Sequence, residues 1–191
     1  LAWQKSPNDP TIQLLHAMYM QEHGDVGNAA NLYRAMLQKK DAPLGTSTAL
    51  STIHFERGDY QAALNLAQAD LQRNPDYVSA QQIKAKCLLK LGRPQSCVDA
   101  IKDTLLRHPF NRKLNLIMYE ALCKLGRFED AMPCALRNLA GSDFIGYYTD
   151  AKERVKKLLK ILPKENAYKI IETVSQEVDR THYAMKFHFY M

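Results

Sequence analysis

Residues 58–75 read Gly-Asp-Tyr-Gln-Ala-Ala-Leu-Asn-Leu-Ala-Gln-Ala-Asp-Leu-Gln-Arg-Asn-Pro, and the spacing inside this stretch recurs along the chain. Glycines stand 34 residues apart, a small residue follows each by five positions, and a leucine follows that residue by eight. A fixed period between about 20 and 50 residues is typical of stacked repeats. The sequence therefore predicts a repeat array, marked by Gly24, Gly58, Gly92 and Gly126, by Ala29, Ala63, Cys97 and Ala131, and by Leu37, Leu71, Leu105 and Leu139.

Each repeat has the pattern of two helices joined by a turn. Apolar residues three and four positions apart precede each glycine and follow it, which is the spacing of an amphipathic helix. The glycine can end the first helix because it adopts left-handed dihedral angles at little cost. Pro75 and Pro109 follow the second helices of two repeats, where proline stops a helix. The unit is therefore predicted to be an antiparallel helix pair.

These residues resemble the tetratricopeptide repeat, a 34-residue helix–turn–helix, and the closest copy combines Gly58-Asp59-Tyr60, Ala63 and Pro75. The first repeat departs from the pattern with Asp41 in place of the proline, and the third has Pro94 in its turn. The resemblance covers roughly residues 8–143. It implies an all-α, right-handed superhelical solenoid of antiparallel helix pairs. The unbroken period of 34 disfavours the related pentatricopeptide arrays, which have a period of 35 and bind RNA.

The phase of the repeat predicts three parts of the chain. Residues 1–8 are expected to end a preceding repeat, because Trp3 and Pro7 stand 34 and 68 positions before Leu37 and Pro75. A mature N-terminus left by processing is the alternative. Residues 9–143 are expected to form four tandem repeats, and residues 144–191 a degenerate repeat or a pair of capping helices with an aromatic tail. We therefore expect the chain to be part of a longer array or of a multi-subunit complex.

The C-terminal part is predicted to hold two helices and an apolar tail. The first helix, from about 143 to 162, has an apolar stripe, and the second, from about 164 to 180, has another. The tail from His182 is rich in aromatic residues and is expected to pack on the array, on a partner or on further repeats. The stripes are Phe144, Tyr148, Ala151, Val155, Leu158 or Leu159 and Leu162 in the first helix, and Tyr168, Ile171, Val174 and Val178 in the second.

Charge does not mark this chain strongly as a nucleic-acid-binding protein. The net charge is +6 with a pI of about 9.1, and it is divided evenly between residues 1–143 and 144–191. The densest basic run, from Lys152 to Lys164, is expected to be the solvated face of a helix. No apolar stretch is long enough to insert into a membrane, and no signal segment occurs in this sequence.

The sequence contains no motif for catalysis, for a metal or for a cofactor. Cys87, Cys97, Cys123 and Cys134 lack the spacing of a zinc site, and no phosphate-binding loop or nucleophile motif occurs. Cys87 and Cys97 are expected to be buried, unpaired thiols, which favours a reducing compartment such as the cytoplasm; a disulfide between them is the alternative. We therefore predict that this segment is not an enzyme.

The resemblance implies that the first helix of each pair lines a concave groove, mainly through its second, fifth, ninth, twelfth and thirteenth positions. Thr11, Gly45, Ser79 and Lys113 are taken as the second positions. The groove is then apolar and polar at its N-terminal end and basic at the other. The predicted groove residues are Leu14, Met18, Thr52, Phe55, Gln82, Lys86, Lys90, Lys113, Glu120 and Lys124.

Such a groove predicts a protein-binding scaffold that holds a peptide segment or a partner subunit with acidic and apolar side chains within a larger assembly. Solvated lysines without a ligand are the alternative interpretation of the basic end. Two other functions stay open: a nucleic-acid-binding array that uses the basic half, and the regulatory arm of an enzyme whose catalytic domain lies outside this sequence. The first lacks groove aromatics other than Phe55 on which bases could stack.

Overall fold

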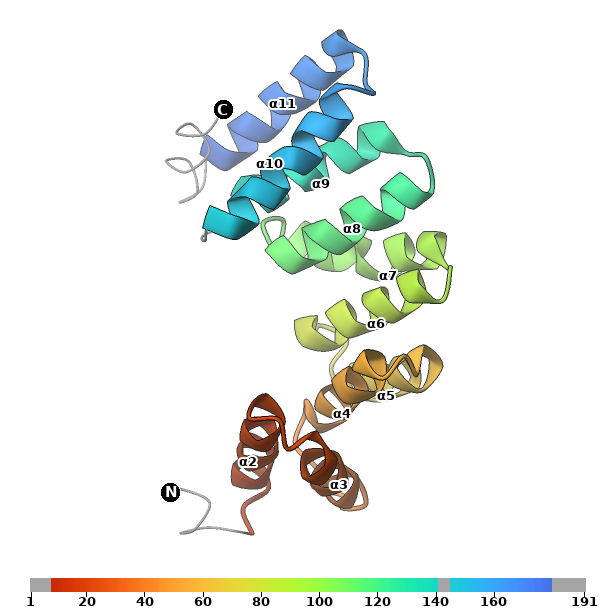
Figure 1. Ribbon diagram of the computed structural model, residues 1–191, viewed down its shortest axis with the longest axis vertical. Helices are drawn as coiled ribbons and strands as arrows, with labels where there is room; N and C mark the ends of the chain where they lie inside the picture. The colour runs from red at the N-terminus through yellow and green to blue at the C-terminus, as the bar shows by residue number, and fades with distance from the viewer. Residues whose placement is uncertain (1–7, 141–144, 180–191) are drawn as a thin grey trace. The chain divides into compact units, whose positions relative to one another are not determined.

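The computed structural model describes residues 8–140 and 145–179, and all the secondary structure in these ranges is helical (Figure 1). The predicted all-α class is confirmed. The chain divides into two compact units, Leu1–Leu91 and Gly92–Met191, and the boundary falls between the two helices of the third repeat. Each unit is described here by itself.

The first unit is built from two complete helix pairs and the first helix of a third pair. Helix α2 packs on α3, α3 on α4, α4 on α5, and α6 on both α5 and α4 (Figure 1). This is the contact pattern of stacked helix pairs, in which each pair covers the apolar face of its neighbour. The helices are α2 (Pro10–Glu22), α3 (Val26–Leu37), α4 (Thr46–Glu56), α5 (Tyr60–Arg73) and α6 (Val78–Lys90).

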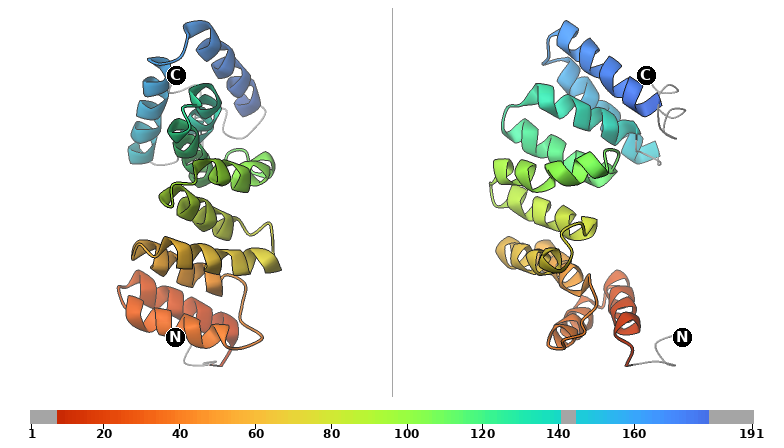
Figure 2. Two further views of the ribbon diagram at one scale, coloured as in Figure 1. Left: turned by 90° about the vertical axis from the view of Figure 1, so that its right-hand side faces the viewer. Right: turned by 180° about the vertical axis from the view of Figure 1, so that it is seen from behind.

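The second unit is arranged around α9. Helix α7 packs on α8, α8 pairs with α9, and both α10 and α11 pack on α9 (Figure 2). The two C-terminal helices thus cover α9 separately. The helices are α7 (Pro94–Arg107), α8 (Arg112–Lys124), α9 (Phe128–Ala140), α10 (Ile145–Leu159) and α11 (Lys164–Asp179).

The repeated glycines adopt the left-handed conformation that the sequence predicts. Their φ angles are +88° at Gly24, +87° at Gly58, and +72° at both Gly92 and Gly126. After α4, the Gly58 N–H donates to the Phe55 carbonyl and the Asp59 N–H donates to the His54 carbonyl, at 3.0 and 2.9 Å. These bonds satisfy the last carbonyl groups of the helix. A Cβ on Gly58 would meet no atom within 4 Å, so the backbone angle and not crowding requires glycine there.

The small residues five positions after the glycines are completely buried. Ala29, Ala63, Cys97 and Ala131 each have an exposed fraction of 0 %. In the first unit Ala29 belongs to a core cluster with Ala17, Ala30, Tyr33, Leu50 and Ile53, which joins helices α2, α3 and α4. Complete burial at all four positions indicates that the helices pack closely there.

A buried carboxylate fixes the loop before α4. Asp70, on α5, has an exposed fraction of 0 %, and its Oδ2 accepts hydrogen bonds from Gly45 N, Thr48 N and Thr48 Oγ1 at 3.1, 2.8 and 2.7 Å. Its Oδ1 lies 3.7 Å from Arg73 Nη1. Asp70 thus caps the N-terminus of α4 from a different helix, where the free N–H groups and the helix dipole favour an anion.

This cap corrects one assignment of the sequence analysis. Gly45 was expected at the second position of a helix, but it precedes α4 and has a φ of +99°. A Cβ at this position would also lie 2.7 Å from the hydroxyl of Tyr77. Pro94 likewise is the first residue of α7 and does not lie in the turn, because proline fits the first helical turn.

The C-terminal helices bury most of the predicted stripes. Val155, Leu158, Leu162, Val174 and Val178 are at least 91 % buried. One expectation was wrong: the exposed fraction of Tyr168 is 70 %. Of the two leucines that the sequence left as alternatives, Leu158 is buried and Leu159 has an exposed fraction of 42 %. Leu159 and Tyr168 each lie one residue, about 100° of helix rotation, from the buried Leu158 or Ala167. The expectations for Phe144, for residues 1–7 and for the tail beyond Asp179 fall outside the described residues.

The predicted basic run is mostly the solvated face that was expected. Lys156, Lys157, Lys160 and Lys164 are exposed, whereas Lys152 and Arg154 are half-buried. Arg154 Nη1 lies 3.3 Å from Asn138 Oδ1 and so ties α10 to α9.

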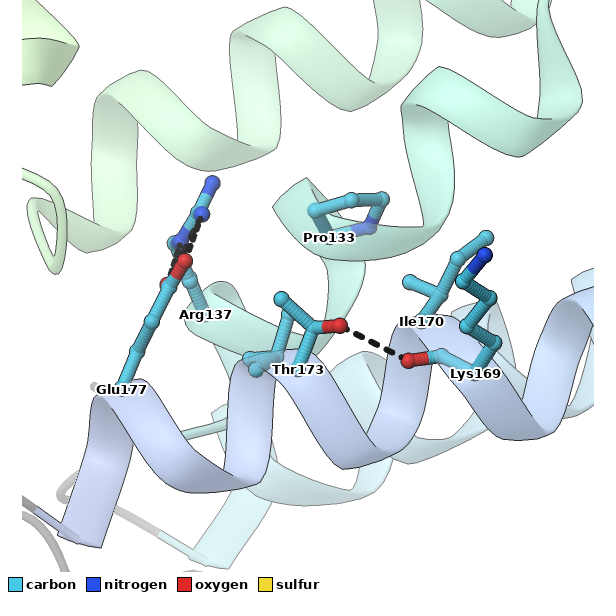
Figure 3. A pocket seen from close by; sticks show the side chains of 7 residues that line it. Pro133, Arg137, Lys169, Ile170, Thr173 and Glu177 are labelled. Carbon is cyan, nitrogen blue, oxygen red and sulfur yellow. Dashed lines mark hydrogen bonds and ion pairs between the residues drawn. The ribbon is translucent and has the colours of Figure 1, made fainter.

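Polar contacts also attach α11 to α9. Arg137 and Glu177 form a bidentate ion pair with N–O distances of 2.8–3.0 Å (Figure 3), and Asn166 Nδ2 donates to Glu129 Oε1 at 2.6 Å. Both pairs follow the same order along the two helices, so α11 runs parallel to α9. The sequence could not reveal the ion pair, because its partners are 40 residues apart.

The substitution Ala63→Leu tests the close contact inside the second repeat. The larger side chain should overpack a site without free space and lower the free energy of unfolding by about 1–3 kcal/mol. Ala62→Leu is the matched control, since Ala62 is exposed on the same helix and should tolerate the change. Urea denaturation measures both variants, and equal stability of the two would contradict the buried contact.

Replacement of Asp70 tests the cap on α4. Asp70→Ala leaves the N–H groups of Gly45 and Thr48 without their acceptor and should cost about 2–4 kcal/mol of unfolding free energy. Asp70→Asn keeps one acceptor oxygen and should cost less. Asp103→Ala removes an exposed carboxylate and serves as the control in the same denaturation experiment. If Asp70→Ala matched that control, the cap would contribute nothing measurable.

Removal of the charge in Glu177→Gln should loosen α11. The pair is partly exposed, with 25 % of the Arg137 side chain and 39 % of the Glu177 side chain accessible, so we expect a loss of about 1 kcal/mol. Hydrogen exchange followed by mass spectrometry should show faster amide exchange in α11 and unchanged exchange in α5. The control Glu172→Gln changes an exposed residue of the same helix. The same exchange rates in both variants would argue against the role of the pair.

Candidate partner-binding surfaces

The predicted groove residues of the first unit lie on α2, α4 and α6, the first helices of three repeats. Leu14, Thr52 and Phe55 are half-buried, and Met18 has an exposed fraction of 42 %. Leu15 and Tyr19 are also exposed, at 60 % and 58 %. With Met18 they follow the i, i+3, i+4 spacing of one helix face. Sequence reasoning missed Leu15 and Tyr19, although this spacing was a usable signal.

Phe55 and Lys86 are brought together by the packing of α4 on α6. The Nζ atom of Lys86 lies 5.9 Å from the centroid of the Phe55 ring, within cation–π range. The Tyr60 ring lies on the other helix of the same repeat, with its centroid 5.3 Å from that of Phe55 and tilted by 57°. Phe55 and Lys86, a predicted apolar and a predicted basic residue of the groove, are therefore neighbours in this unit. Tyr60 is a further residue of this site. It was not predicted, because it lies on a second helix and the predicted groove positions all lie on first helices.

A shallow hollow of about 420 Å³ lies at the turn between α4 and α5. It is bordered by His54, Asp59, Tyr60 and Leu91, and His54 Nδ1 lies 3.3 Å from Asp59 Oδ2. Tyr60 both borders this hollow and contacts Phe55. The other predicted groove residues of α6 are polar: Gln82 is half-buried and Lys90 is exposed.

The predicted residues of the second unit lie on one face of α8. Lys113, Glu120 and Lys124 are all exposed, and their spacing of seven and four positions aligns them along the helix. The neighbouring Leu116 and Cys123 are half-buried. This face is charged, and its apolar side chains, Leu116 and Cys123, are only partly accessible. The surface around Phe55, in contrast, combines aromatic rings with a lysine.

Burial keeps the cysteines as neutral thiols by raising their pKa values. All four are unpaired, so the alternative of a Cys87–Cys97 disulfide is wrong. Burial raises the pKa of Cys97 to about 12 and the pKa values of Cys87 and Cys134 to about 11, which suppresses the nucleophilic thiolate. Among residues 8–140 and 145–179, no three His, Cys, Asp or Glu side chains gather as metal ligands would.

A second recess, which sequence reasoning missed, lies between α9 and α11. Its volume is about 220 Å³, and Pro133, Ile170 and Thr173 line it beside the Arg137–Glu177 ion pair (Figure 3). Within the described part of the chain, none of the helices combines the length and the apolar character needed to cross a membrane.

Comparisons with known proteins agree with this architecture. A family model described as "Anaphase-promoting complex, cyclosome, subunit 3" matches residues 22–104. Comparison with curated proteins gives no match. Among solved structures, a tetratricopeptide repeat protein from Parabacteroides merdae ATCC 43184 is similar with 16 % identity and a TM-score of 0.64, over 95 % of this chain and 73 % of that one.

Two structures of MamA are similar to the same degree. MamA 41-end from Desulfovibrio magneticus RS-1 has 14 % identity and a TM-score of 0.64, over 90 % of this chain and 98 % of that one. MamA AMB-1 has 15 % identity and a TM-score of 0.64, over 90 % and 92 %. At this identity the structures show the fold alone. Together with the 34-residue period, the left-handed glycines and the buried small residues, they show that the chain has the fold of a tetratricopeptide repeat array.

Proposed function

We propose that this chain is a protein-binding scaffold that holds a peptide segment or a partner subunit with acidic and apolar side chains on the first-helix faces of its repeats. The observation that carries the proposal is the Phe55–Lys86 pair, in which an accessible ring and an ammonium group lie 5.9 Å apart on neighbouring helices. Tetratricopeptide repeats in general are protein-interaction scaffolds, so the proposal concerns where and what this chain binds.

The chemistry of this surface suits an amphipathic ligand. Phe55, Tyr60 and Met18 offer apolar area, whose burial provides affinity. Lys86 and Lys90 offer positive charge, which speeds encounter and fixes the register of an acidic partner. In the second unit, Lys113 and Lys124 offer further positive charge around Glu120, and we propose that they also bind acidic side chains of a partner.

We further propose that the chain works inside a larger assembly, as part of a longer array or of a multi-subunit complex. The matching family model describes a subunit of such a complex, the anaphase-promoting complex or cyclosome. Its match to residues 22–104, which lie largely in the first unit, supports a similar role for this chain. Buried, unpaired thiols fit a cytoplasmic, reducing environment. We infer that the segment acts by binding and not by catalysis.

Kinetic measurements with a co-purifying partner test the surface. Phe55→Ala removes buried apolar area and should speed dissociation at least several-fold, whereas Lys90→Glu should slow association and flatten its dependence on salt. Tyr168→Ala and Lys160→Glu, which change exposed residues of the second unit, are the matched controls. Surface plasmon resonance measures the rates, and circular dichroism checks that helical content is unchanged.

Two results would contradict this function. Unchanged rates in both Phe55→Ala and Lys90→Glu would move the binding site away from the first-helix face. Loss of the partner after nuclease treatment would instead favour the nucleic-acid-binding array, since phosphate contacts by lysines would then explain the charge.

A further inference from the structure

The second unit contains an apolar groove that the proposed function does not use. It lies where α7, α8, α9 and α11 meet and has a volume of about 540 Å³, in the range of cavities that hold ligands. Leu105, Phe110, Met118 and Cys134 line it, and Leu106 borders it with an exposed fraction of 81 %. Lys102 and the Arg137–Glu177 ion pair supply its charged rim.

The exposure of Leu106 indicates that something covers this groove. Leu106 is the most exposed large apolar side chain in the described part of the molecule, and it stands beside an apolar hollow and not alone on a polar surface. A contiguous apolar patch of this kind marks an interaction site. Because the lining is mainly apolar, burial of apolar surface has to supply most of the binding energy.

The chain itself supplies a matching segment. Residues 180–191 follow α11 directly, and Glu177 on the rim of the groove stands only three positions before Arg180. Twelve extended residues reach about 40 Å, which is ample for a groove that borders the same helix. Apolar side chains recur at Tyr183, Met185, Phe187 and Phe189, an alternation that would put them on one side if the segment were extended.

We propose that the aromatic segment 183–190 occupies the groove between α7, α8, α9 and α11, as an intramolecular ligand that covers Leu106 and Cys134. The segment lies outside the described residues, so its position has to be determined by experiment. The proposal is independent of the partner surface around Phe55, which belongs to the first unit.

Cys134 is a built-in reporter of the occupied groove. Alkylation by N-ethylmaleimide at pH 8, followed by peptide mass spectrometry, measures the reaction rate of each cysteine in the intact chain. Three serine substitutions, Phe187→Ser, Phe189→Ser and Tyr190→Ser, remove three aromatic side chains of the segment together. We expect Cys134 to react at least threefold faster in this variant, while Cys97, which is completely buried, keeps its rate.

A change on the groove side should have the same effect. Leu106→Glu places a charge on the border of the groove and should speed alkylation of Cys134 at least threefold. Leu159→Glu is the matched control, because Leu159 is also an exposed leucine of the second unit and does not line the groove. It should leave the rate unchanged.

If a variant loosens the whole fold, alkylation of Cys97 is accelerated as well. A peptide titration then still tests the proposal. A synthetic peptide with the sequence of residues 180–191 should bind to the serine variant saturably and restore protection of Cys134, and Leu106→Glu should abolish this binding. An alkylation rate of Cys134 that is the same with and without the tail substitutions would overturn the proposal. Protection that rises with protein concentration would overturn it too, since the occupant would then be a second copy of the chain.

Discussion

The structure depends on one position in each repeat that cannot hold a large side chain. Ala29, Ala63, Cys97 and Ala131 are completely buried, and each follows a left-handed glycine by five residues. Helices can approach closely only where the side chains between them are small, and the turn glycine sets which residues meet at that point. Because stacked repeats contact only their neighbours, the same local requirement has to be satisfied again in every pair.

This local requirement explains what could be predicted from the sequence. The turn glycines, the buried small residues and the unpaired thiols all follow from spacing within one repeat, and the structure agrees with each of them. The pairing of Phe55 with Lys86 followed less directly: the repeat frame placed both residues on first helices, and the contact required α4 to pack on α6.

Features that depend on residues far apart in the sequence could not be predicted. The cap on α4 joins Asp70 to Gly45, 25 residues away, and the ion pair on α11 joins Arg137 to Glu177, 40 residues away. No periodicity links these partners, since neither pair repeats. The exposure of Leu159 shows a different limit: adjacent leucines fit one stripe equally well on paper, and only the packed helix decides that Leu158 is the buried one.

The buried carboxylate of Asp70 has a consequence for the modularity of the array. Asp70 belongs to α5, but the groups that it binds lie at the N-terminal end of α4, next to the junction between the first and the second repeat. Exchanging α4 alone or α5 alone for a consensus helix would separate the carboxylate from Gly45 and Thr48 and leave the N-terminus of α4 without its acceptor. The helices of different repeats look interchangeable by their period, but α4 and α5 can be transplanted only together, as one block from about residue 43 to residue 77.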